Sequence, residues 1–184
     1  MGEGRRFHIV ADGSPETAGD EVDQRDTRSA QRKIVLLDLE NMLFGQHETQ
    51  RSTQDRSEEI LRLAEARRPT DMVIVGCNPN LAFSAKDLFP LARIVTGHGK
   101  DGADRALIDT LDLQHAAERF AELCIVSGDH AFAEIAHAAR KAGMRVRVVA
   151  PHFGLSTALR VYADTAIMLP EEPAEETNGG ALAA

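Results

Sequence analysis

Three aspartates fall where an α/β protein places reactive groups. Asp38 ends an apolar run in LLDLENM, Asp129 follows another in IVSGDHAF, and Asp104 lies in GHGKDGADRALI, at the start of a helical pattern. Ligands of open parallel sheets bind beyond the carboxyl ends of the strands, so the three carboxylates converge if the two runs form neighbouring strands. Like charges that meet in one cleft raise one another's pKa unless a cation lies between them.

A divalent metal ion is the simplest cation for such a cluster. Hard ions such as Mg²⁺ and Mn²⁺ take oxygen ligands and bind through one or two carboxylates with substrate phosphates, as in metal-dependent phosphodiester cleavage. Asp38, Asp104 and Asp129 are the predicted metal ligands, and Asn41 would add an amide for a metal water or a phosphate oxygen. Structural interpretations stay open beside this one. Asp38 could form an Asx turn with Asn41, and Asp129 could cap the helix that follows it. Asp104 could be an acid in the first turn of a helix that Asp101 caps.

The elements that would position these residues follow a βαβ rhythm. Short apolar runs alternate with helical patterns, and they lie at residues 33–39, 71–77, 92–97, 123–128, 145–151 and 165–169. Runs that are apolar on both faces are typical of a parallel sheet covered on both sides. The sequence therefore predicts an α/β fold, a three-layer α/β/α sandwich with a mainly parallel central sheet of five to six strands.

Capping signals predict where the helices begin and end. Ser57 is expected to cap a helix over 57–68, Asn78 with Pro79 to open the next, and Gly143 to end the helix before the fifth strand. A long helix is expected to follow Asp104 and lead into the fourth strand. The polar stretch 45–57 is expected to form a long loop.

Composition limits the class of protein. The 184 residues are 43% hydrophobic and 27% charged, with a formal net charge of −8, values typical of one globular domain. Residues 1–31 and 171–184 lack apolar periodicity and are predicted to be disordered tails around a domain at 32–170. Two cysteines in apolar runs exclude a disulfide scaffold and favour the cytoplasm, and no run approaches the ~18 apolar residues of a membrane span.

The three motifs together resemble the NYN domain, a branch of the PIN-like metal-dependent ribonucleases, and the resemblance covers residues 32–170. The matching segments are Asp38-Leu39-Glu40-Asn41, Gly102-Ala103-Asp104 and Ser127-Gly128-Asp129-His130-Ala131-Phe132. The resemblance implies that Asp38, Asp104 and Asp129 bind Mg²⁺ or Mn²⁺ and activate a water against RNA phosphodiesters, with Asn41 assisting. A metal-dependent endoribonuclease is thus the leading functional hypothesis.

The chain departs from the family pattern in the third motif. Many members carry a second acid in Ser-Gly-Asp-x-Asp-Phe, where this sequence has Ala131. Glu134, one turn further on, could compensate, and Asp109 is an approximate match for an acid inside the long helix. A non-catalytic PIN-like RNA-binding or regulatory module is therefore the alternative hypothesis.

Other phosphoryl chemistry fits the sequence less well. A haloacid dehalogenase-like phosphatase needs a second Asp where Glu40 stands, and a receiver domain needs an acid after the third run, which ends in Thr96-Gly97. Aromatic residues total 4%, so contacts are expected to the RNA backbone rather than to stacked bases. The candidate substrate contacts are Lys100, Arg105, Arg51, Arg56 and Ser127. No membrane partner is expected, and a homo-oligomer stays open.

Overall fold

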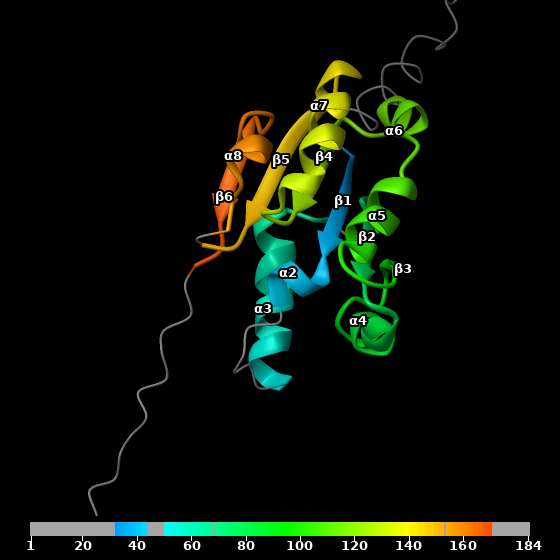
Figure 1. The fold of residues 1–184 in the computed structure, drawn as a ribbon, viewed down its shortest axis with the longest axis vertical. Helices are drawn as coiled ribbons and strands as arrows, with labels where there is room; N and C mark the ends of the chain where they lie inside the picture. Colours follow the sequence, from blue (N-terminus) through cyan, green and yellow to red (C-terminus); the bar gives the residue numbers. More distant parts are fainter. Residues whose placement is uncertain (1–31, 44–49, 68, 153, 171–184) are drawn as a thin grey trace, which may run out of the picture.

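The computed structural model describes residues 32–43, 50–67, 69–152 and 154–170 (Figure 1). The tails predicted at 1–31 and 171–184 lie outside these ranges, as does the segment 45–49 of the predicted loop. Within the described ranges, no helix is long and apolar enough to cross a membrane.

The centre of the fold is a six-stranded sheet with the order β3-β2-β1-β4-β5-β6. Its strands are β1 (Lys33–Asp38), β2 (Met72–Cys77), β3 (Arg93–Thr96), β4 (Glu122–Val126), β5 (Arg145–Ala150) and β6 (Thr165–Met168). Every neighbouring pair runs parallel. The order reverses between β1 and β4, which therefore lie side by side although the chain visits two other strands between them.

Helices cover both faces of this sheet, which confirms the predicted α/β/α sandwich (Figure 1). One face packs against α2 (Leu39–Leu43), α3 (Gln50–Leu63) and α4 (Ala82–Leu88). The other packs against α5 (Gly102–Asp109), α6 (Leu113–Arg119), α7 (Ala133–Lys141) and α8 (Thr157–Arg160). Two short 3₁₀ turns, η1 (Pro79–Leu81) and η2 (His130–Phe132), follow β2 and β4. Successive strand residues point to opposite layers, so both faces of β1 are apolar.

Two of the expected helix ends are correct. The Asn78 side chain accepts a hydrogen bond from the Asn80 N–H at 3.1 Å and opens η1, with Pro79 at its first position. Gly143 follows α7 with φ of +85°, the left-handed conformation in which glycine carries no steric penalty.

The expected cap at Ser57 is wrong, because α3 already begins at Gln50. Ser57 is buried inside that helix, and its hydroxyl donates to the Gln54 carbonyl oxygen at 2.7 Å. A serine in the middle of a helix can donate its hydroxyl to a carbonyl oxygen of the preceding turn. The residue type alone therefore does not indicate that a helix begins there. Residues 50–57 are accordingly helix rather than loop.

The expected long helix before β4 is two helices. α5 ends at Asp109, and α6 begins at Leu113 with Asp112 as its N-cap. The Asp112 carboxylate accepts hydrogen bonds from the N–H groups of Gln114 and His115, both at 3.1 Å. These bonds satisfy donors at the start of α6, so the second helix begins with its own cap.

Burial on both faces makes a stability prediction for β1. Leu36 and Leu37 are fully buried and point into opposite layers. We expect Leu36→Ala and Leu37→Ala each to lower the free energy of unfolding by about 2–5 kcal/mol in urea titrations. The control Leu91→Ala, at a side chain that is 70% exposed, should change it by less than about 0.5 kcal/mol. A loss at only one of the two β1 positions would contradict the three-layer packing.

Candidate active site

The three predicted aspartates line one pocket at the carboxyl ends of the strands. The pocket has a volume of about 290 Å³. In the β1–β4 ladder Leu37 pairs with Val126, so the next residues of both segments, Asp38 and Ser127, meet at the same edge. Asp104 reaches this edge from the first turn of α5, and Asp129 from the loop after β4.

Asp38 is held by fixed donors from two segments. It is buried, with 5% of its surface exposed. The Ser127 hydroxyl donates to its Oδ2 at 3.0 Å, and the Asn41 N–H donates to its Oδ1 at 3.3 Å. The second of these bonds reaches three residues along the chain to the first turn of α2, so it is an N-terminal capping bond rather than the Asx turn that the sequence leaves open. The carboxyl orientation is therefore set by β4 as well as by β1.

Asp38 and Asp104 form a pair of acids in direct contact. Burial and then the neighbouring charge of Asp104 raise the pKa of Asp38 from 3.8 to about 7, and the two carboxyl groups hydrogen-bond to each other. Burial, followed by the charge of Asp129, also raises the pKa of Asp104. Two acids in contact share protons unless a cation allows both to ionise, so the pair has the electrostatics of a cation site.

The approach of α5 to the pocket depends on a glycine. A Cβ atom on Gly97 would overlap the carbonyl group of Gly102, so only glycine lets the end of β3 pass this close to the start of α5. Asp101 occupies the N-cap position of α5, as expected, but its φ is +56° and its side chain makes no capping hydrogen bond. Asp101 lines the pocket instead.

Asn41 ties the ends of β1 and β4 together. Its side-chain oxygen Oδ1 accepts a hydrogen bond from the Gly128 N–H at 3.1 Å. Gly128 is itself constrained, because a Cβ atom there would overlap the Gly154 carbonyl group. The amide nitrogen Nδ2 of Asn41 is thus the group that remains to donate a hydrogen bond into the pocket.

Asp129 has a capping role in addition to its place in the pocket. Its Oδ1 accepts a hydrogen bond from the Ala131 N–H at 2.8 Å and lies 2.9 Å from His130 Nδ1. Both contacts use Oδ1, which leaves Oδ2 for a ligand. In the described part of the chain, no group of three or more His, Cys, Asp or Glu side chains forms a ready-made metal site. The donors that can hold a hard cation are therefore Asp38 and Asp104, with Asp129 nearby.

Ser127 is a positioning residue rather than the expected substrate contact. It is fully buried. Its hydroxyl donates to Asp38, as described above, and accepts a hydrogen bond from the Asp129 N–H at 3.1 Å. Because both functions of the hydroxyl are used inside the protein, a substrate has no access to it.

Four basic residues were expected to contact substrate. Those whose side chains the structure describes do not line the acidic pocket. Arg105 donates from its guanidinium to the carbonyl oxygens of Lys100 and Asp101, at 2.8 and 3.3 Å, and so fastens the loop before α5. Lys100 is exposed in that loop. Arg56 donates to the Pro170 carbonyl oxygen at 3.2 Å. The side chain of Arg51 lies outside the described residues.

Glu40 joins the site in a way that the sequence did not specify. It lines the pocket, and its Oε1 accepts a hydrogen bond from the Asn78 N–H at 2.7 Å. This bond links the end of β1 to the end of β2. The position of Glu40 inside the first motif indicated that it could lie near the site. The motif does not indicate which main-chain N–H its carboxylate binds.

Sequence comparison decides the family. The NYN domain family model matches residues 34–170. The chain belongs to the NYN domain family. This confirms the resemblance stated from the three motifs. NYN domains are PIN-like nuclease domains and are generally ribonucleases.

Comparison of structures supports the fold of this NYN domain. A crystal structure of a protein of unknown function from Vibrio parahaemolyticus matches with a TM-score of 0.55 and 16% sequence identity. The match covers 78% of this chain and 95% of that chain. At this identity the likeness shows the fold alone. No curated protein matches the chain significantly.

Glu134, which could compensate for the missing acid at Ala131, and Asp109, the approximate match for the acid inside the long helix, both lie outside the pocket. Ala131 occupies the position at which the family pattern has its second acid, and its N–H donates a hydrogen bond to Asp129. Glu134 is exposed and lines a separate pocket between α7 and α8, so it does not compensate. Asp109 is exposed at the end of α5 and does not line the acidic pocket. The predicted compensation is therefore wrong on geometric grounds.

The raised pKa of Asp38 predicts a stability that depends on pH. The folded chain binds this proton more tightly than the unfolded chain does, so ionisation costs stability as the pH rises from 3.8 through about 7. In EDTA at pH 8, Asp38→Asn should raise the free energy of unfolding by an amount on the order of 1–4 kcal/mol.

The same substitution should have little effect near pH 4, where the folded chain already holds the proton. The control Asp109→Asn removes an exposed acid of α5 and should change stability little at either pH. An equal gain from Asp38→Asn at both pH values, measured by urea unfolding, would contradict the assignment of the effect to ionisation.

Proposed function

We propose that this NYN domain is a metal-dependent endoribonuclease that hydrolyses RNA phosphodiester bonds at the pocket of Asp38, Asp104 and Asp129. The observation that carries the proposal is the buried contact between Asp38 and Asp104. Among the described residues, no Lys or Arg forms an ion pair with either. An acid pair of this kind destabilises a fold, and a divalent cation bound between the two groups would relieve the repulsion.

The donor set suits Mg²⁺ or Mn²⁺. Carboxylates are hard oxygen ligands, and Mg²⁺ is commonly held by one or two of them, with waters and substrate phosphates completing its shell. Asp38 and Asp104 would be the principal ligands, and Oδ2 of Asp129 would be the third. When bound, such an ion supplies two effects, a lower pKa for water and stabilisation of the charge that develops on the phosphate.

The remaining residues would orient the ligands and the substrate. Ser127 and the Asn41 N–H keep the Asp38 carboxyl in place. The Asn41 Nδ2 group is positioned to donate to a phosphate oxygen. Lys100 is exposed in the loop before α5 and is the basic candidate for a further backbone phosphate, since the Arg105 guanidinium binds carbonyl oxygens of that loop. A pocket of acids repels a polyanion, so RNA binding there should require the metal.

The substrate class and the compartment are parts of the same proposal. RNA rather than DNA rests on the family, whose members are generally ribonucleases. Cys77 and Cys124 are both free and buried, which supports the reducing environment of the cytoplasm. Single-stranded and hairpin RNA are therefore the substrates to test first.

Two observations favour a second function, a non-catalytic RNA-binding or regulatory module. The pocket lacks the second acid of the family pattern at Ala131, and the described side chains form no ready-made set of three metal ligands. A module of this kind would keep the fold and bind Mn²⁺ weakly or not at all. Metal binding and RNA cleavage therefore separate the two functions.

The proposal predicts metal-dependent cleavage. Purified protein incubated with end-labelled single-stranded and hairpin RNA should cut it in Mn²⁺ or Mg²⁺ and should not in EDTA. Asp38→Asn/Asp129→Asn should lower the rate by more than about 100-fold, the upper end of what loss of outer-shell partners of a metal costs. The matched control is Asp109→Asn, which removes an acid of α5 outside the pocket and should cleave like wild type.

Two results would count against an endoribonuclease. Cleavage that persists in the double variant would identify a contaminating nuclease. Absence of cleavage by wild type, together with a flat Mn²⁺ titration in calorimetry, would favour the non-catalytic module.

Metal binding has its own signature in stability. Mn²⁺ at neutral pH should raise the thermal midpoint of wild type, because an ion that binds only the folded chain stabilises it by mass action. Asp38→Asn/Asp104→Asn should lose this rise, whereas Asp109→Asn should keep it. A rise of equal size in all three proteins, measured by scanning calorimetry, would place the ion elsewhere.

A further inference from the structure

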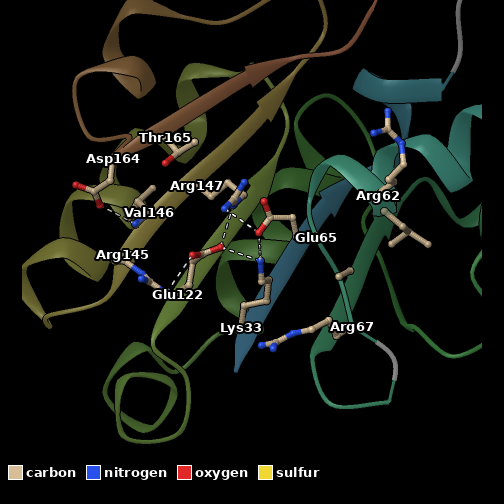
Figure 2. A pocket seen from close by; sticks show the side chains of 12 residues that line it. Lys33, Arg62, Glu65, Arg67, Glu122, Arg145, Val146, Arg147, Asp164 and Thr165 are labelled. Atoms are coloured by element: carbon tan, nitrogen blue, oxygen red, sulfur yellow. Dashed lines mark hydrogen bonds and ion pairs between the residues drawn. The ribbon is translucent and has the colours of Figure 1, made fainter. Parts of the chain in front are cut away.

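A second pocket, the amino-end pocket, lies at the opposite edge of the sheet from the acidic pocket (Figure 2). It has a volume of about 690 Å³, and residues at the starts of β1, β4 and β5 line it, namely Lys33, Glu122, Arg145 and Arg147. The end of α3 and the chain after it close the other side. The pocket shares no lining residue with the acidic site.

The lining of the amino-end pocket carries an excess of positive charge. Its cations are Lys33, Arg62, Arg67, Arg145 and Arg147, and its acids are Glu65, Glu122 and Asp164. The chain as a whole has a formal net charge of −8. A cationic cavity on an acidic protein is a local feature that attracts anions.

The cations at the centre of the pocket share too few carboxylates. Glu122 Oε1 contacts Lys33 Nζ and Arg147 Nε, both at 3.1 Å, and its Oε2 lies 3.6 Å from Arg145 Nη2. Burial alone would raise the pKa of Glu122, but hydrogen bonds from Lys33 and Arg147 hold that pKa below its usual value. Glu65 is a second carboxylate of the cluster, with its Oε2 3.6 Å from Lys33 Nζ and 3.0 Å from Arg147 Nη2. Two carboxylates thus serve three cations, which leaves the cluster with an excess of positive charge.

Arg147 presents unused donors at a fixed position. Its Nε binds Glu122, and its Nη2 binds Glu65 at 3.0 Å, so the guanidinium plane is held from two sides. The side chain is 14% exposed, and Nη1 makes no hydrogen bond to the described residues. A guanidinium fixed in this way matches the paired oxygens of a phosphate or carboxylate.

Two exposed arginines flank this centre. Figure 2 shows Arg67 and Arg145 on either side of the Lys33–Glu122 pair. Arg67 Nε lies 3.7 Å from Asp71 Oδ2, and Arg145 Nη2 lies 3.6 Å from Glu122 Oε2. The two arginine side chains are nevertheless 52% and 68% exposed, so both are accessible to a ligand in the cavity. Leu61 and Ala66, which are partly exposed, add apolar surface to the same cavity.

We propose that the amino-end pocket binds a phosphate-bearing anion of nucleotide size. The arginines would contact the phosphates, and the apolar surface would contact the sugar or base. The volume lies in the range of about 300–1,000 Å³ that is common for ligand pockets. The proposal does not rest on the proposed nuclease activity, because the two sites lie at opposite ends of the strands.

Calorimetric titration of the full chain tests the site. ADP and inorganic tripolyphosphate serve as probes in EDTA, which removes metal-assisted binding at the acidic pocket. Both should bind saturably at one site per chain, and the affinity should fall as salt is added. Arg67→Gln/Arg145→Gln should weaken binding at least about tenfold, because it removes two charge-assisted contacts.

The matched control is Arg93→Gln/Arg119→Gln, which removes the same charge from exposed arginines outside the pocket and should leave the affinity nearly unchanged. Arg145→Gln alone, at the more exposed side chain, repeats the test if the double variant is poorly folded. Binding of a 5′-phosphorylated trinucleotide but not its 5′-hydroxyl form, with no ADP binding, would support the site with an RNA end as the phosphate source. Equal weakening in both double variants, or no saturable binding of any probe at millimolar concentration, would overturn the proposal.

Discussion

The parallel pairing of β1 with β4 is the contact on which the candidate active site depends. It places the end of β1 beside the end of β4, and two hydrogen bonds then fix the acidic pocket across that boundary, from Ser127 to Asp38 and from Gly128 to Asn41. A shift of one residue in this register would turn Leu36 and Leu37 into each other's layers and move Asp38 out of reach of Ser127. The apolar packing of both layers therefore also determines the geometry of the carboxyl groups.

The same strands carry opposite charge at their two ends. β1 begins at Lys33 and ends at Asp38. β4 begins at Glu122, whose carboxylate pairs with cations, and the chain after β4 leads to Asp129. At the amino ends an acid is surrounded by bases, whereas at the carboxyl ends acids face one another. The first arrangement lowers the pKa of Glu122, and the second raises that of Asp38. The carboxyl end therefore stores unfavourable electrostatic energy, which a bound cation could release.

The four central strands were predictable from the sequence because both of their faces are largely buried. The run at 33–39 became β1 (Lys33–Asp38), and that at 145–151 became β5 (Arg145–Ala150). Helix starts were less predictable, since serine and aspartate serve inside helices, at caps and in pockets alike. Ser57 and Asp101 are the examples, and only the packing around them distinguishes these roles. The three aspartates of the pocket could be predicted from their positions near strand ends. The orientations of the Arg105 and Arg56 side chains could not, because they depend on which carbonyl oxygens lie within reach.

The separation of Asp38 and Ser127 along the chain has a consequence for biosynthesis. The two residues lie 89 positions apart, and the loop that carries Gly128 packs against Gly154 and Ser156 further on. Contacts between such distant segments form late, because the intervening chain must first be ordered. During translation the acidic pocket stays incomplete until the segment through α8 has left the ribosome. A chain that ends before Ser156 lacks the contacts that fix the loop of Gly128, and with them the complete acidic pocket.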